Sequence, residues 1–74
     1  MTLYDLLNEG SAALLQAGDS DGENDAKLLL FEAFHLDLVH FLMDRLRPLS
    51  EQDEQVQEQI RTYRSMITKR ASRI

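Results

Sequence analysis

The chain has no cysteine and no tryptophan, and only one proline and three glycines among its 74 residues. Without cysteine it can form neither disulfide bonds nor thiolate metal sites. No apolar run approaches the roughly 18 residues of a transmembrane helix, and the N-terminus lacks the basic segment of a signal peptide. A chain of this length suits one small domain, and we expect it in the cytoplasm.

Basic residues are scarce in the first part of the chain. Residues 1–60 contain all 13 acidic residues but only three basic ones. Five bases and no acid follow, at Arg61, Arg64, Lys69, Arg70 and Arg73. Cations suit the dipole at the C-terminal end of a helix, so these residues fit a solvated helix end. They also fit a basic edge that meets an acidic partner or RNA. The net charge of −5 argues against nucleic acid, so we name the five as candidate partner-binding residues only.

Motifs for catalysis, cofactor binding or metal binding are absent from the chain. It has no glycine-rich phosphate loop, CxxC, HExxH or GxSxG. The alternating acids from Asp19 suggest a calcium loop, but the required sixth-position glycine and twelfth-position glutamate are replaced by Asn24 and Leu30. His35 and His40 are five residues apart and do not share a helix face. We therefore predict no catalytic, cofactor-binding or metal-ligating residue.

The N-terminal segment has clear signals for one helix. Thr2 is a good N-cap, and Asp5 three residues later resembles a capping box. Apolar residues then follow helical spacing until Gly18, which is placed to end the helix in a left-handed conformation. The polar stretch from Asp19 to Asn24 predicts a loop.

The most apolar run of the chain predicts a central helix over Asn24–Phe34. Apolar side chains fall on nearly every side of this helix, with Leu29, Leu30 and Ala33 on the main face. A helix that is apolar nearly all round is typically surrounded by neighbours. We therefore expect the other helices to pack around it.

Two further helices are predicted in the C-terminal half. Asp37 should cap a short helix over 38–43 that needs packing to be stable, and Pro48 marks the following connector. Ser50 should cap a long helix from Glu51 to about Ala71. Its apolar stripe comprises Val56, Ile60, Tyr63, Ile67, Ala71 and Ile74. The prediction is an all-α domain over 1–74, a small bundle of four to five helices.

The order of these features resembles the N-terminal helical domain of the bacterial release-factor glutamine methyltransferases, the PrmC or HemK family. The resemblance is carried by the opening Met1–Leu7, the Asp25–Leu30 run, the Pro48–Glu51 turn and the terminal Lys69–Ile74 segment. Family members often have glycine where His35 stands.

This resemblance implies that the chain is a non-catalytic N-terminal fragment of a longer methyltransferase. Such enzymes use S-adenosylmethionine to methylate the glutamine of the GGQ motif in peptide-chain release factors. The methyl-donor site and the NPPY motif belong to a C-terminal Rossmann-like domain, and no residue here matches them. The implied partners are the release factor and the enzyme's own catalytic domain. We expect a monomeric fragment without membrane or direct nucleic-acid contact.

Two other functions are compatible with the residues. The chain could be a stand-alone helical protein-interaction or oligomerisation module, with the stripe from Val56 to Ile74 as a dimer seam. It could also bind nucleic acid through the basic edge, which would make binding strongly salt-dependent.

Overall fold

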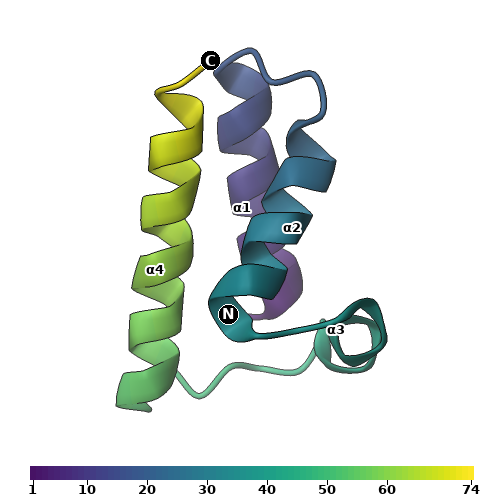
Figure 1. Ribbon diagram of the computed structural model, residues 1–74. Coiled ribbons are helices and arrows are strands. Elements are labelled where there is room, and N and C mark those ends of the chain that lie inside the picture. Colours follow the sequence, from purple (N-terminus) through teal and green to yellow (C-terminus); the bar gives the residue numbers. More distant parts are fainter.

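The computed structural model describes residues 1–74 as four α-helices without a strand. Helices α1 (Leu3–Gln16) and α2 (Gly22–Phe34) form an antiparallel hairpin, and α4 (Glu54–Ala71) runs alongside both (Figure 1). The short α3 (Leu38–Asp44) lies at one end of this three-helix arrangement, opposite the C-terminal end of α4 (Figure 1). The predicted small all-α bundle is confirmed.

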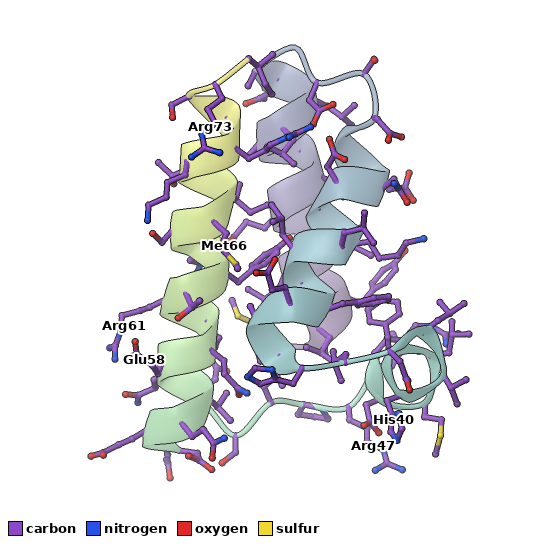
Figure 2. All side chains as sticks on the ribbon, viewed as in Figure 1. His40, Arg47, Glu58, Arg61, Met66 and Arg73 are labelled. Atoms are coloured by element: carbon purple, nitrogen blue, oxygen red, sulfur yellow. The ribbon has the colours of Figure 1, made fainter.

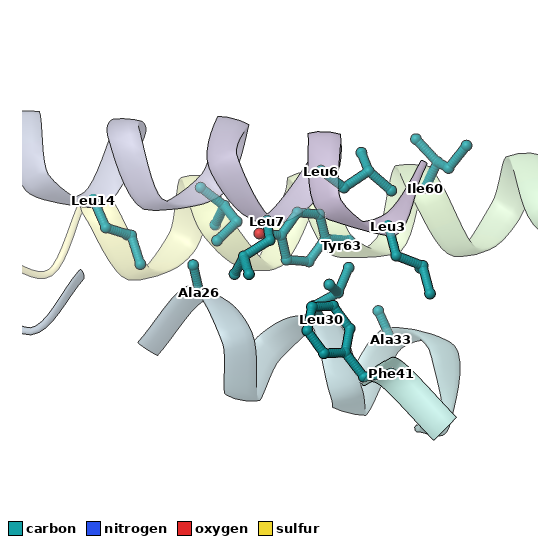
Figure 3. Packing of buried hydrophobic residues seen from close by; sticks show 11 residues of the cluster. Leu3, Leu6, Leu7, Leu14, Ala26, Leu30, Ala33, Phe41, Ile60 and Tyr63 are labelled. Carbon is teal, nitrogen blue, oxygen red and sulfur yellow. The ribbon is translucent and has the colours of Figure 1, made fainter. Parts of the chain in front are cut away.

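Side chains from all four helices build one hydrophobic core (Figure 3). Helix α2 packs against α1 and α4, and its Phe31 ring lies 5.4 Å from the Phe41 ring of α3, centroid to centroid. Helix α2 thus contacts every other helix. The buried members of the core are Leu3, Leu6, Leu7, Leu14, Ala26, Leu30, Ala33, Phe41, Ile60, Tyr63 and Ile67.

Helix α2 is nevertheless not enclosed on all sides, which corrects the sequence-based expectation. Ala26, Leu30 and Ala33 are buried, whereas the Leu28 side chain is 54% exposed and Leu29 is only partly buried. The reason is the number of neighbours: α1 and α4 cover one broad side of α2, and no fifth helix covers the other. Apolar composition alone overstated the burial of this helix.

The two ends of α1 are formed as predicted. The Asp5 amide donates to Thr2 Oγ1 over 3.1 Å, and the Thr2 amide donates to Asp5 Oδ2 over 2.9 Å, which completes the capping box. Gly18 follows the helix with φ of 102°, a left-handed conformation that glycine adopts without a Cβ penalty.

Helix α2 begins at Gly22, two residues earlier than predicted. The Gly22 amide donates to the Asp19 carbonyl over 3.0 Å, so a glycine assigned to the loop forms the first helical turn. A Cβ at this position would lie 3.0 Å from the Leu15 nitrogen and 3.1 Å from the Leu14 Cβ. Glycine therefore permits the close approach of α1 and α2 at the hairpin.

Helix α4 begins at Glu54, so the prediction that Ser50 caps a helix from Glu51 is wrong. Asp53 is the N-cap, and its carboxylate accepts from the Gln55 amide over 2.8 Å. Residues 50–53 instead form a turn in which the Asp53 amide donates to the Ser50 carbonyl. The preceding chain is held by the N-terminus, because Leu49 donates to the Met1 carbonyl over 2.8 Å.

The end of α2 contains the one non-glycine residue with positive φ. His35 adopts φ of 54° and ψ of 49°, and its amide donates to the Phe31 carbonyl at the helix terminus. This left-handed conformation is the one that glycine adopts most readily, which gives a physical reason for glycine at this position in the family that the sequence resembles.

No helix of the domain has the length and apolar character needed to span a membrane.

Candidate protein-binding surfaces

The five predicted partner-binding cations of α4 and its C-terminal end differ in their surroundings (Figure 2). Arg61 pairs with Glu58 one turn earlier, and Arg64 and Arg70 pair with other helices. Lys69 and Arg73 form no ion pair. Two of the five cations therefore have no ion-pair partner, whereas the other three are partly neutralised by carboxylates within the domain.

Arg64 connects α4 to α1. Its Nε and Nη2 atoms donate to the two carboxylate oxygens of Glu9, each over 2.9 Å. This two-point hydrogen bond raises the pKa of the Arg64 guanidinium, which stays charged. Because both side chains are about half exposed, the pair fixes geometry more than it adds stability.

Arg70 connects the C-terminal end of α4 to the turn between α1 and α2 and to the first turns of α2. Its Nη2 lies 2.9 Å from Asp25 Oδ2, and its Nε lies 3.7 Å from Asp19 Oδ2. A hydrogen bond between the two carboxyl groups raises the pKa of Asp25 and lowers the pKa of Asp19. Asp19 Oδ2 is buried and has no hydrogen-bond partner, and the Arg70 guanidinium is the cation paired with it. This cluster has a structural role, because the half-exposed Arg70 side chain links α4 to both aspartates.

Helix α3 is capped as predicted, and ends one residue later than expected. The Asp37 carboxylate accepts from the backbone amide of His40 over 2.8 Å and lies 2.7 Å from His40 Nδ1. These hydrogen bonds lower the pKa of Asp37. His40 is exposed, and neither it nor His35 belongs to a cluster of titratable residues that could hold a metal ion.

The apolar side chains of α3, a helix that was expected to need packing to be stable, are mostly exposed. Only Phe41 enters the core. The exposed apolar side chains are 49–66% accessible, and we call them the α3 face: Leu38, Val39, Leu42, Met43 and Leu46. Their i, i+4 spacing is visible in the sequence, but an apolar stripe of this kind normally indicates a core contact. Sequence reasoning therefore missed this surface.

Concave sites on the domain are shallow depressions open to solvent. One of about 330 Å³ lies beside the connector between α3 and α4 and is lined partly by Phe34, Leu36 and Leu49. Another of about 200 Å³ lies beside Leu28, Asp25 and Arg70. Neither is lined by a nucleophile next to a base.

Comparison with protein families matches residues 5–74 to the PrmC N-terminal domain. The matched residues include all of α2, α3 and α4 and most of α1. The chain belongs to the PrmC N-terminal domain family. Comparison with curated proteins and with solved structures gave no significant match.

Membership in the PrmC family connects this helical domain to methyltransferases. The resemblance described from the sequence is thereby confirmed at the level of the family. The unpaired cations Lys69 and Arg73 and the α3 face are two exposed surfaces of the domain. They lie toward opposite ends of the molecule (Figures 1 and 2).

Proposed function

We propose that this domain recognises the protein substrate of a PrmC methyltransferase, a peptide-chain release factor. The observation that carries the proposal is the family match over residues 5–74, which spans nearly the whole chain. The domain itself is non-catalytic in this proposal. Methylation of the GGQ glutamine, with S-adenosylmethionine as donor, is assigned to a C-terminal catalytic domain in the cytoplasm.

The arrangement of charges supports a protein partner. Lys69 and Arg73 lie near the C-terminal end of α4 without internal ion pairs. They can meet carboxylates of the release factor or of the catalytic domain without breaking an existing contact. Arg61, Arg64 and Arg70 can join such a contact only by sharing or exchanging a carboxylate that they already bind.

The alternative of a dimer seam along α4 required an exposed apolar stripe on this helix, and the structure does not have one. Ile60, Tyr63 and Ile67 are buried in the core of the domain itself, and Ile74 lies beyond the helix, 53% exposed. The apolar stripe of α4 is therefore already covered by α1 and α2.

Calorimetric titration of the chain with a release factor tests the proposal. We expect saturable binding by the release factor and no binding heat from S-adenosylmethionine. Stoichiometric binding of S-adenosylmethionine, or the lack of any release-factor binding, would contradict the proposal.

Two single charge reversals on α4 refine this test. Lys69→Glu removes an unpaired cation, whereas Arg61→Glu makes the same change of charge at a residue paired with Glu58. We expect Lys69→Glu to weaken release-factor binding more than Arg61→Glu, and the difference to shrink at high salt.

A further inference from the structure

The α3 face is an apolar helix surface directed away from the domain core. Four of its five side chains lie within α3 and, at 100° per residue, occupy an arc of about 140° around the helix axis. The fifth, Leu46, follows in the turn after the helix. Phe41, the buried residue of α3, falls outside this arc. The wider apolar side of α3 thus faces solvent, the reverse of the usual orientation of a surface helix.

The core does not need these five side chains. Helix α3 is held through Phe41, which packs near Phe31, and through the Tyr4 amide, which donates to the Arg45 carbonyl over 3.1 Å. Val39 and Met43 are 63% and 64% exposed, so they contribute little to folding. Contiguous exposed apolar surface on a small domain is typical of a protein-binding site.

We propose that the α3 face is an apolar contact surface for the release factor, separate from the cations Lys69 and Arg73 toward the other end of the domain. This inference rests on the proposed function and specifies where the contact lies. The occupant is a protein surface with apolar side chains at its centre and carboxylates at its border. The border of the α3 face carries Arg45 and Arg47, two of only three bases before position 61, together with Asp37 and Asp44. Asp37 is already bonded to His40, so charge complementarity favours carboxylates of the partner opposite the two arginines.

Arg47 is the better placed of these two bases for an external contact. Its side chain is 76% exposed, and its ion pair with Asp44 is long, at 3.5 Å (Figure 2). A long, exposed pair is worth little, so Arg47 can turn to a carboxylate of the partner. The net charge of −5 disfavours an anionic membrane as the occupant.

The position of the α3 face favours a separate chain over a domain joined after α4. The C-terminus and α3 lie at opposite ends of the molecule (Figure 1), whose longest dimension is 32 Å. A catalytic domain attached after α4 would begin at the far end from α3. Its point of attachment would therefore not by itself cover the α3 face.

The test compares two variants of the chain in a binding titration with a release factor. Val39→Asp/Met43→Asp places two carboxylates in the α3 face at exposed positions, so the fold should be retained. Leu15→Asp/Leu28→Asp is the matched control, because both leucines are similarly exposed, at 53% and 54%, and neither belongs to the α3 face. Circular dichroism and thermal melting verify that both variants fold.

We expect the α3 variant to lose at least about tenfold in affinity and the control to stay within about twofold. Arg47→Glu should weaken binding more at low salt than at high salt. If the parent chain binds and the α3 variant binds equally well, the location proposed here is wrong while the proposed function stands. If the parent chain does not bind a release factor, both the proposed function and the proposed location are wrong.

Two parallel measurements examine other occupants of the α3 face. Sedimentation of the free chain reports on a second copy, and flotation with anionic phospholipid vesicles reports on a membrane. A dimer or a vesicle complex that the α3 variant abolishes, with release-factor binding unchanged, would overturn the inference.

Discussion

Gly10 of α1 lies directly against the Tyr63 ring of α4, where a side chain of any size would overlap the ring. A methyl group at Gly10 would coincide with the hydroxyl oxygen of Tyr63 and approach its Cζ to 2.8 Å and Ile67 Cδ1 to 2.9 Å. Glycine in the middle of a helix costs about 1 kcal/mol relative to alanine. Here that cost permits α1 and α4 to approach closely enough to bury Tyr63 completely.

Gly10→Ala should therefore destabilise the domain in spite of its better helix propensity. We expect a loss of about 1–3 kcal/mol in the free energy of unfolding, measured by urea denaturation. Because the overlap is largest at the hydroxyl, adding Tyr63→Phe should recover part of the loss, which makes the two changes non-additive. A more stable Gly10→Ala variant would show that the helices do not approach closely here.

Tyr63→Phe should be neutral or stabilising at pH 7, by up to about 1 kcal/mol. The Tyr63 hydroxyl is buried without a hydrogen-bond partner, so removing it leaves no other donor or acceptor without a partner. Most tyrosine hydroxyls in a core are hydrogen-bonded, and their removal costs stability. A loss of more than about 1 kcal/mol would indicate a partner for this hydroxyl.

Burial of Tyr63 should also make the domain less stable at alkaline pH. Burial, assisted by the charge of Glu9, raises the pKa of Tyr63 above its ordinary value of 10.0. A group whose pKa is higher in the folded state contributes stability below its unfolded pKa and loses it as the pH rises. The parent should weaken above about pH 10, as seen in its melting temperature, and Tyr63→Phe should weaken less.

Leu30→Ala should cost about 2–5 kcal/mol, because its side chain is completely buried between α2 and its neighbours. Leu28→Ala is the matched control on the same helix, and with 54% exposure it should cost less than about 1 kcal/mol. Equal losses at both positions, measured by thermal or chemical denaturation, would contradict the one-sided burial of α2.

His35→Gly should stabilise the domain by up to about 1 kcal/mol. The left-handed conformation costs a residue with a Cβ about 1–2 kcal/mol, and glycine avoids this cost while losing more chain entropy. His40→Gly is a suitable contrast, because His40 lies within α3, where glycine should destabilise. A destabilised His35→Gly variant would mean that the His35 side chain makes a compensating contact.

The accuracy of sequence reasoning differed among the elements. The Thr2–Asp5 capping box, the Gly18 terminator and the Asp37 cap were predicted correctly, since each depends on residues within one turn of chain. The start of α4 was predicted three residues too early. Ser50 and Asp53 are both good caps, and local signals did not distinguish them.

The candidate surfaces were harder to predict than the helices. The cluster of five bases was evident from the sequence, but their partners were not, because Glu9 and Asp25 lie 55 and 45 residues from the arginines they bind. The α3 face was missed because apolar spacing does not indicate whether a stripe meets a core or solvent.

The sequence by itself determined that this protein is a small all-α domain, because caps, terminators and helical spacing act between near neighbours in the chain. The PrmC N-terminal type came from the resemblance of its motifs to that family. Only the tertiary structure decided which side of each helix is buried, which arginines are internally paired and that α3 turns its apolar side outward. Those properties depend on which helices stand next to one another. Only α1 and α4 cover α2, and Phe41 is the one α3 side chain buried in the core, so the remaining apolar side chains are left at the surface.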